Sequence, residues 1–307
     1  MRSSTIAADP SLAPDRRALW PGVALALAGS IAFSGKAIIV KLAYRYGVDA
    51  VTLIMYRMLF ALPFFALLAW WAGRGKRPLE GRDWIGVGGL GFSGYYLASF
   101  LDFAGLAYIS AGLERLILYL NPTLVLGLGA LLFRRRVSKR QLVALAVSYC
   151  GLLLVFGVEA GVEGAHVALG AALVFASAIS YALYLVYSGE EVRRLGALRL
   201  TGLASSVACM LCIAQFLVLR PMAALDVAPE VLWLSVLNAT LCTVAPIVMV
   251  MMAIERIGAS VAAQAGMIGP LSTILMGVVI LGERFTASMA FGTVLVLSGI
   301  WLLTKWR

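Results

Sequence analysis

The amino-acid sequence predicts an all-α polytopic membrane protein with ten transmembrane helices, arranged as two inverted repeats of five helices each. Three observations support this fold class. Hydrophobic residues make up 62% of the 307 residues, and charged residues only 13%. Apolar runs of about 20 residues, long enough to cross the hydrocarbon core of a bilayer as helices, recur along the whole chain. The first half of the sequence also aligns with the second.

The apolar runs are continuous, which excludes a soluble fold and a membrane β-barrel. A soluble protein of this composition would expose too much apolar surface, and barrel strands alternate polar with apolar residues. Within a bilayer each segment must satisfy its own backbone hydrogen bonds, so helix is the expected state. The ten expected helices cover residues 19–44, 50–72, 84–108, 111–133, 139–157, 167–188, 198–219, 231–254, 258–281 and 287–304.

Lysine and arginine are concentrated on one side of the predicted membrane. The connection after the fourth helix carries Arg134, Arg135, Arg136, Lys139 and Arg140, whereas the connection after the fifth has neither lysine nor arginine. Positive charge marks the cytoplasmic side, so we expect both termini in the cytoplasm and the chain in the plasma or bacterial inner membrane. The net charge of +10 is a topology signal and predicts no nucleic-acid partner. Residues 1–17 are polar and are expected to form a disordered cytosolic tail.

The two halves match when the chain is shifted by 148 positions. The shift places Ile109 on Ile257, Pro122 on Pro270 and Gly151 on Gly299. Each half holds an odd number of helices, so equivalent helices cross the membrane in opposite directions. We assign residues 18–158 to the first repeat and 165–305 to the second. Inverted repeats of this kind place a binding site near the middle of the membrane, between the halves.

Pro122 and Pro270 fall inside the fourth and ninth predicted helices. Proline removes a backbone hydrogen bond and clashes with the preceding turn, which kinks a helix. Because the two prolines are equivalent in the repeat, we expect them to act as hinges. Prolines that only shape helix packing would leave the same sequence pattern.

Apart from Lys41 at the outer end of the first segment, five charged residues lie within the first four apolar segments: Lys36, Arg57, Asp102, Glu114 and Arg115. From the helical rise, the first three lie at a common depth, ~10–12 Å below the outer surface. We expect Asp102 to pair with Lys36 or Arg57, leaving one cation for a carboxylate-bearing ligand. A purely structural pair, with the remaining lysine reaching toward the headgroups, explains the same pattern. Glu114 and Arg115 are expected near the outer interface, where they cap the hairpin or make a gating contact.

Aromatic residues with a polar group are the other candidates for a binding site. A tyrosine combines an apolar ring with a hydroxyl, which suits an amphipathic ligand. Tyr95 or Tyr96, Ser99 and Phe103 follow helical spacing along the third helix. The predicted binding residues are Lys36, Tyr95, Tyr96, Ser99, Asp102, Phe103, Tyr119, Tyr181, Tyr184, Asn238, Gln264 and Met267.

Several motifs resemble the EamA-type transporters of the drug/metabolite transporter superfamily. In the first half they run from Gly94-Tyr95-Tyr96 through Leu101-Asp102-Phe103 and Leu113-Glu114-Arg115 to Pro122; in the second half they are Ile257-Gly258-Ala259-Ser260, Gly269-Pro270 and Gly282-Glu283-Arg284. The resemblance covers residues 20–305, and within the superfamily the chain is similar to aromatic amino acid exporters. It implies ten helices and export of small metabolites. The first half departs from the pattern, with Arg134-Arg135-Arg136 where the second has Gly-Glu-Arg.

The expected function is therefore transport, secondary-active or facilitative, that exports small amphipathic metabolites, aromatic amino acids first, by alternating access. Export of drugs or organic cations is the alternative, and a passive channel is a third reading.

We expect no enzymatic activity, because the sole histidine, His166, lies in a loop and no catalytic pair is present. Cys209-x-x-Cys212 is expected to pack, so no metal or cofactor is predicted. The expected partners are a small-molecule substrate and the lipid bilayer, with the chain a monomer. Proton coupling and facilitated diffusion both remain open.

Overall fold

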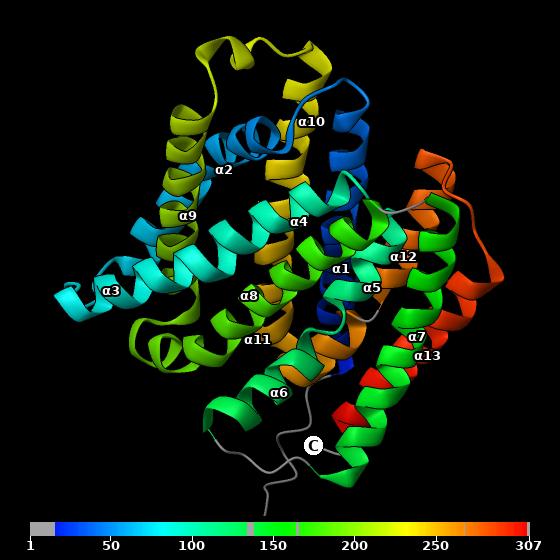
Figure 1. Ribbon diagram of the computed structural model, residues 1–307. Coiled ribbons are helices and arrows are strands. Elements are labelled where there is room, and N and C mark those ends of the chain that lie inside the picture. Colours follow the sequence, from blue (N-terminus) through cyan, green and yellow to red (C-terminus); the bar gives the residue numbers. More distant parts are fainter. Residues whose placement is uncertain (1–15, 134–137, 164–165, 267, 306–307) are drawn as a thin grey trace, which may run out of the picture.

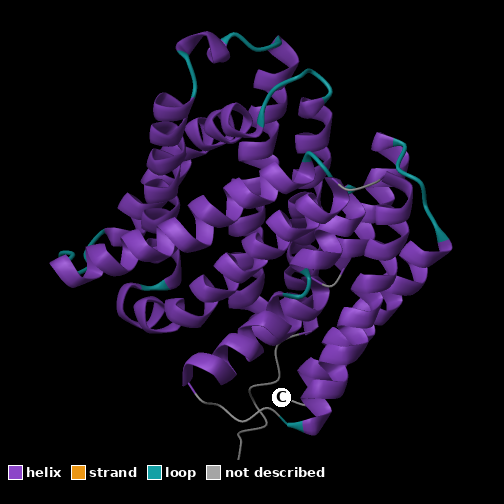
Figure 2. Cartoon of the chain, in the orientation of Figure 1, coloured by secondary structure: helices purple, strands orange, loops and turns teal. Residues whose placement is uncertain are grey.

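The computed structural model describes residues 16–133, 138–163, 166–266 and 268–305, and its regular elements are all helical in these ranges (Figures 1 and 2). Seven helices within them are long and apolar enough to cross a membrane, and two shorter apolar helices cover Ile268–Leu281 and Ala287–Leu303. The third predicted segment is helical from Gly81 to Leu106 but changes helix type along its length. Most of the predicted tail, residues 1–15, lies outside the described residues.

The first half contains α1 (Arg16–Tyr44), α2 (Ala50–Gly73), α3 (Gly81–Leu90), the π-helix η2 (Gly91–Leu97), α4 (Ala98–Leu106), α5 (Ala111–Leu118), α6 (Asn121–Phe133) and α7 (Lys139–Glu163). The second half contains α8 (His166–Leu195), α9 (Ala197–Leu219), the short 3₁₀ helix η3 (Met222–Leu225), α10 (Pro229–Ala239), the π-helix η4 (Thr240–Val244), α11 (Ala245–Gly266), α12 (Ile268–Met276), the π-helix η5 (Gly277–Leu281) and α13 (Ala287–Lys305).

Helices from the two halves pair with each other. The most extensive contacts join α1 to α11, α2 to α9, α7 to α13 and α4 to α8. In Figure 1, α7 and α13 lie along one edge of the molecule, and α2 and α9 lie on the opposite side. The pairing is symmetric: the first helix of each half packs against the third segment of the other, and the second and fifth helices pack against their own equivalents. A twofold relation between the repeats produces this pattern.

Close helix approach at the α7–α13 pair depends on glycine. A Cβ atom added at Gly151 would lie 2.6 Å from the carbonyl oxygen of Gly292, and one added at Gly292 would lie 2.7 Å from the carbonyl oxygen of Gly151. The two backbones therefore touch where these glycines face each other. Small residues at helix crossings are typical of membrane proteins, in which close van der Waals contact drives helix association.

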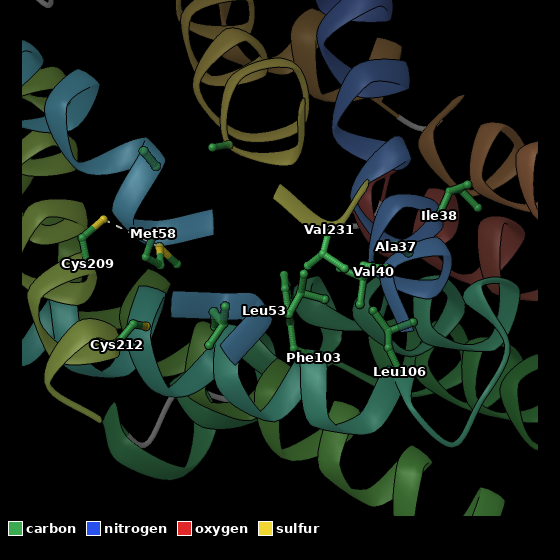
Figure 3. Close-up of a cluster of buried hydrophobic side chains, with 14 of the residues drawn as sticks. Ala37, Ile38, Val40, Leu53, Met58, Phe103, Leu106, Cys209, Cys212 and Val231 are labelled. Carbon is green, nitrogen blue, oxygen red and sulfur yellow. Dashed lines mark hydrogen bonds between the residues drawn. The ribbon is translucent and has the colours of Figure 1, made fainter. Parts of the chain in front are cut away.

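The largest apolar core cluster joins α1, α2, α4, α9 and α10. Figure 3 shows Val40, Leu53, Phe103 and Val231 pointing toward one another from these helices. Cys209 lies in this cluster, and its sulfur is 3.7 Å from the sulfur of Met58. Cys212 is also fully buried here, so both thiols contribute to packing.

Helix irregularities occur at equivalent places in the two halves. The π-helix η2 in the third segment corresponds to η4 in the eighth, after the shift of 148 residues. In the fourth segment, α5 ends at Leu118 and α6 begins at Asn121, so the helix is interrupted there. π-helices are frequent at functional sites, and broken helices line binding sites in inverted-repeat transporters.

The prolines can be compared with the described helices in the first half only. Pro122 is the second residue of α6 and directly follows the interruption between α5 and α6, so the fourth segment is irregular at this place. The first turn of a helix tolerates proline, because its N–H groups have no partner within the helix. Residue 267 lies outside the described residues, so the kink expected at Pro270 stays a prediction. One prediction about local structure was wrong: the connection expected at residues 255–257 is absent, because α11 continues through it.

A buried carboxylate ties the start of α3 to the end of α8. The Asp83 side chain is fully buried; its carboxylate lies 2.5 Å from Arg194 Nη2 and 3.1 Å from Arg77 Nη2. It also accepts the backbone N–H of Glu80 at 2.9 Å. The Glu80 N–H and the two guanidinium groups hold the pKa of Asp83 below its usual range, although burial acts in the opposite direction.

We expect Asp83→Asn to lower the thermal unfolding temperature at pH 7. A group whose pKa is lowered by folding stabilises the folded state above its unfolded pKa of about 3.9, and this contribution is lost as pH falls through the folded value. The two unfolding temperatures should therefore converge in acid, as measured by differential scanning fluorimetry in detergent. Glu80→Gln is the control, because this side chain is mostly exposed and its ion pair with Arg77 contributes little. A difference that persisted unchanged in acid would contradict the prediction.

Candidate functional site

A cavity of about 340 Å³ lies between the two halves. Its walls come from α1, α2, η2, α4, α5 and α6 of the first half and from α8, α9, η4 and α11 of the second. Charged, aromatic and small polar side chains line it: Lys36, Arg57, Asp102, Arg115; Phe33, Tyr95, Tyr119, Tyr181; Ser99, Asn121, Ser177, Ser205 and Thr243. It thus combines apolar surface with a few fixed polar groups, which is typical of small-molecule sites.

Three side chains beside this cavity form a buried charge triad, which we define as Lys36, Asp102 and Glu114. The Lys36 ammonium lies 2.5 Å from Asp102 Oδ2 and 3.1 Å from Glu114 Oε1. The three residues come from α1, α4 and α5, and all are buried. Of the two partners expected for Asp102, the structure selects Lys36. With both carboxylates ionised, the triad has a net charge of −1.

The expected position of Glu114 at the outer interface was wrong. Its side chain is 0% exposed and contacts Lys36 in the protein interior. The cap of α5 is Ser110, whose hydroxyl accepts the backbone N–H of Leu113 at 3.0 Å. Glu114 therefore acts as a buried partner in the triad. It does not cap the hairpin.

Arg57 and Arg115 line the same cavity and are also buried. Arg57 Nε donates to Thr243 Oγ1 at 3.1 Å, and its guanidinium lies 5.1 Å from the centre of the Phe103 ring. Arg115 Nη2 donates to Ser34 Oγ at 3.1 Å. Within the described ranges, neither guanidinium makes an ion pair with a carboxylate. Aromatic faces stabilise such cations, as the Phe33 and Tyr119 rings do for Arg115.

An aromatic wall closes one side of the cavity. The hydroxyls of Tyr95 and Tyr184 lie 3.2 Å apart, and the Tyr181 ring stacks on that of Tyr184 with 5.5 Å between ring centres. A Cβ atom at Gly94 would lie 2.4 Å from the Tyr184 ring, so glycine is required for this packing. Tyr119, between α5 and α6, completes the wall. Its hydroxyl donates to the carbonyl oxygen of Gly266 at 2.5 Å.

The π-helical stretch next to this wall exposes backbone carbonyls that α8 satisfies. Ser180 Oγ donates to the Ser93 carbonyl at 2.7 Å, and Ser177 Oγ donates to the Ala98 carbonyl at 2.6 Å. Carbonyl groups buried in a membrane need such partners, because no bulk water is available. The serines thus hold α8 against η2 and α4, and Ser177 also lines the cavity.

Four contacts lie at the face that carries the α1–α2 connection, called the outer face below; three of them join the two halves and one lies within the first half. Glu283 Oε1 accepts the backbone N–H of Ala111 at 2.9 Å and lies 4.0 Å from the Lys41 ammonium. Arg45 Nη2 donates to the Leu281 carbonyl at 2.8 Å. Ser110 Oγ donates to Glu159 Oε1 at 2.5 Å. These four contacts are called the outer closure.

Toward the opposite face, the space continues. A second cavity of about 390 Å³ shares Phe33, Tyr95, Arg115 and Tyr181 with the first. Its other walls include Ser30, Leu185, Ser188, Thr201 and Val250, which lie toward the start of α1 and the junction of α8 with α9. The described α2–α3 connection, with Arg74 and Arg77, belongs to this side, as does the α8–α9 junction (Figure 1). The cavities therefore extend away from the outer closure.

Of the predicted binding residues, Lys36, Tyr95, Ser99, Asp102, Tyr119 and Tyr181 line the first cavity, and Tyr184 lines the second. Three further predicted residues line neither cavity. Tyr96 packs against the core beside Phe92, Phe103 is fully buried in that core, and Asn238 is buried with its amide 3.5 Å from the Lys36 carbonyl. Met267 and the Gln264 side chain lie outside the described residues. Neither Pro122 nor Pro270 is a wall residue.

Phe33, Asn121, Ser177, Ser205 and Thr243 line the cavity but were not predicted. Phe33 lies three residues before Lys36, on the same helical face, and that spacing was a usable signal. Arg57 was recognised as an intramembrane charge, either as a partner for Asp102 or as the unpaired cation available to a carboxylate-bearing ligand. The small hydroxyl residues carry no signal in a sequence in which serine and threonine are also common at packing positions.

Comparison with known proteins agrees with this architecture. The model of the EamA-like transporter family matches residues 20–157 and again residues 168–305. Uncharacterized transporter YcbK of Bacillus subtilis (strain 168) is 33% identical over 281 residues, covering 88% of this chain and 88% of that protein. Uncharacterized transporter sll1319 of Synechocystis sp. (strain ATCC 27184 / PCC 6803 / Kazusa) is 25% identical over 270 residues, covering 82% and 78%.

A solved crystal structure supports the fold alone, because its sequence identity is 16%. It superimposes with a TM-score of 0.62, covering 93% of this chain and 99% of that chain. The two matches to the family model span both halves, in agreement with the symmetric helix pairing. The chain therefore belongs to the EamA-like transporter family and is a membrane transporter of small substrates.

Proposed function

We propose that this protein exports small amphipathic metabolites, aromatic amino acids first among them, across the plasma or inner membrane by alternating access. One observation carries the proposal: a cavity between the two repeats combines buried cations with a wall of tyrosine rings. The rings match the flat apolar body of an aromatic solute, and the guanidinium groups match its carboxylate. Export is the direction that the resemblance to amino acid exporters implies.

Alternating access is supported by the asymmetry of the two faces. The outer closure blocks one end of the cavity, whereas the second cavity extends it toward the other end. The interrupted fourth segment and the paired π-helices supply places where the halves can bend. In inverted-repeat transporters, rocking of one half against the other exposes a central site to each side in turn.

Organic cations are a weaker substrate class for this cavity. Its aromatic walls suit them, but the carboxylates of Asp102 and Glu114 are already engaged by Lys36. A passive channel is disfavoured by the outer closure, which interrupts any continuous path. In reconstituted membranes, an organic-cation transporter would give cation counterflow, and a passive channel would give ion conductance.

Counterflow in proteoliposomes tests the proposal. Vesicles loaded with unlabelled L-phenylalanine, L-tryptophan or L-leucine are expected to accumulate the labelled external form transiently, and empty liposomes are not. The same assay with an imposed pH gradient separates proton coupling from facilitated diffusion. Accumulation of organic cations without accumulation of any amino acid would overturn the amino acid proposal, and channel-rate conductance would overturn alternating access.

Filling the cavity is expected to stop transport without unfolding the protein. Ser99 lines the cavity from α4, and Ser99→Trp would occupy much of its volume. We expect counterflow to fall to the level of empty liposomes. The matched control is Ile85→Trp on α3, where the side chain is 78% exposed. Equal transport by the two variants would show that substrate does not pass through this cavity.

A further inference from the structure

Two buried guanidinium groups face the cavity without an anionic partner. Arg57 is 5% exposed and Arg115 is 7% exposed. Arg57 Nη1 and Arg115 Nε have no hydrogen-bond partner among the described residues. A buried arginine normally donates to a carboxylate or several carbonyls, because an uncompensated charge away from water is costly. Both arginines line the first cavity, which a ligand can enter.

The charges around the cavity do not cancel. Lys36, Arg57 and Arg115 carry three positive charges, and Asp102 and Glu114 carry two negative ones when ionised. Lys41, Glu159 and Glu283 belong to the outer closure and do not line the cavity. An excess of one positive charge therefore faces the space in which a substrate would sit. A ligand with a net charge of −1 neutralises it.

The carboxylates are poorly placed to receive an ammonium group. Lys36 already contacts both of them, at 2.5 Å and 3.1 Å. Only Asp102 lines the cavity, and a single oxygen of it, Oδ1, lacks a partner. An ammonium group at that oxygen would lie close to Lys36, so like charges would oppose it. The arrangement favours an acidic group over a basic one.

We infer that the substrate of this cavity is a monovalent organic anion with an aromatic or similarly flat apolar body, its acidic group bound by Arg57 and Arg115. This inference rests on the proposed transport function and narrows it, because a net anion is bound more tightly than a zwitterionic amino acid of the same shape. The Phe33, Tyr95, Tyr119 and Tyr181 rings bind the body, and Lys36 keeps the two carboxylates away from the acidic group.

Three probes with one phenyl body separate the charge classes. We would measure binding of 3-phenylpropionate, L-phenylalanine and phenethylamine to the purified full-length protein in nanodiscs at pH 7 by isothermal titration calorimetry. We expect affinity to decrease in that order. The order is measured on the unmodified protein, so it does not depend on the stability of any variant. Tighter binding of L-phenylalanine or phenethylamine, or binding of none of the three, would overturn the inference.

Variants then assign the acidic group to its partners. Arg57→Gln is expected to weaken 3-phenylpropionate binding roughly 10–100-fold, the effect of losing a hydrogen bond between charged groups, and to leave phenethylamine binding unweakened. Arg57→Lys should retain part of the affinity, because it keeps the charge but loses the planar fork. Arg199→Gln is the control: Arg199 is a buried arginine that donates to the Arg77 carbonyl and does not line the cavity.

Failure of this inference can be told from failure of the proposed function. Counterflow of L-phenylalanine without binding or transport of 3-phenylpropionate would support the proposed amino acid transport and contradict the inference that the substrate is a net anion. Equal loss of 3-phenylpropionate binding in Arg57→Gln and Arg199→Gln would assign the effect to general destabilisation and overturn the role of Arg57.

Discussion

Replacing Lys36 with methionine is expected to abolish transport and to destabilise the protein strongly. The substitution leaves Asp102 and Glu114 buried beside each other with no cation between them. Removing one partner of a buried ion pair costs about 3–5 kcal/mol, because the remaining charge stays uncompensated. Here two carboxylates lose the same partner, and their mutual repulsion adds to the loss. Thermal unfolding in detergent measures the stability, and counterflow in proteoliposomes measures transport.

Two further variants show whether the effects of Lys36→Met come from losing a lysine in general or from leaving the two carboxylates without a cation. Lys41→Met, five residues further along α1, removes a partly exposed lysine that donates to the Ile109 carbonyl and should lower stability much less. The triple variant Lys36→Met, Asp102→Asn, Glu114→Gln removes all the charges of the triad and is expected to recover part of the lost stability, as neutral replacements of buried ion pairs often do. Full transport by Lys36→Met would show that the triad has no part in binding.

The sequence limited the partner of Asp102 to Lys36 or Arg57, whereas it did not predict the position of Glu114. Counting the helical rise from each outer end gave Lys36 and Asp102 the same depth, and they are in contact. The same count placed Glu114 near the surface, because the connection at Ser110 was assumed to lie there. In the structure Glu159 and Glu283 cover that connection, so Ala111 is 0% exposed and α5 begins inside the protein.

The sequence also could not show which face of the third segment lines the cavity. Tyr95, Ser99 and Asp102 form one helical stripe, and Tyr96 and Phe103 form the neighbouring one; each stripe contains a tyrosine that could face a ligand. Only the packing of α8 against η2 decides which stripe lines the cavity, and this packing depends on Gly94 and on hydroxyl contacts from far along the chain. Helical periodicity reports the spacing of residues on a helix. It cannot report the identity of the neighbouring helix.

Removing the Glu283 carboxylate is expected to open the outer face. Glu283 joins the second half to the first: it accepts the Ala111 N–H at 2.9 Å and lies 4.0 Å from the Lys41 ammonium. Gly282, with φ of +73°, ends η5 in a left-handed turn and directs the chain so that the Glu283 side chain reaches α5. A hydrogen bond to a charged group contributes about 1.5–3 kcal/mol. Glu283→Ala should therefore shift the population toward an outward-open state roughly ten-fold or more.

Spin labels at Tyr46 and Phe285 report this shift, because both side chains are exposed and lie near the outer ends of the two halves. In a background with the exposed Cys150 replaced by serine, pulsed electron–electron resonance should show a longer distance component that grows in Glu283→Ala. Glu230→Ala is the control, since this exposed residue lies at the start of α10 on the same face. Identical distance distributions in the two variants would mean that Glu283 only caps α5. A gain in the longer component specific to Glu283→Ala would show that the end-of-helix Gly-Glu-Arg segment, present only in the second half, is the moving part of the gate.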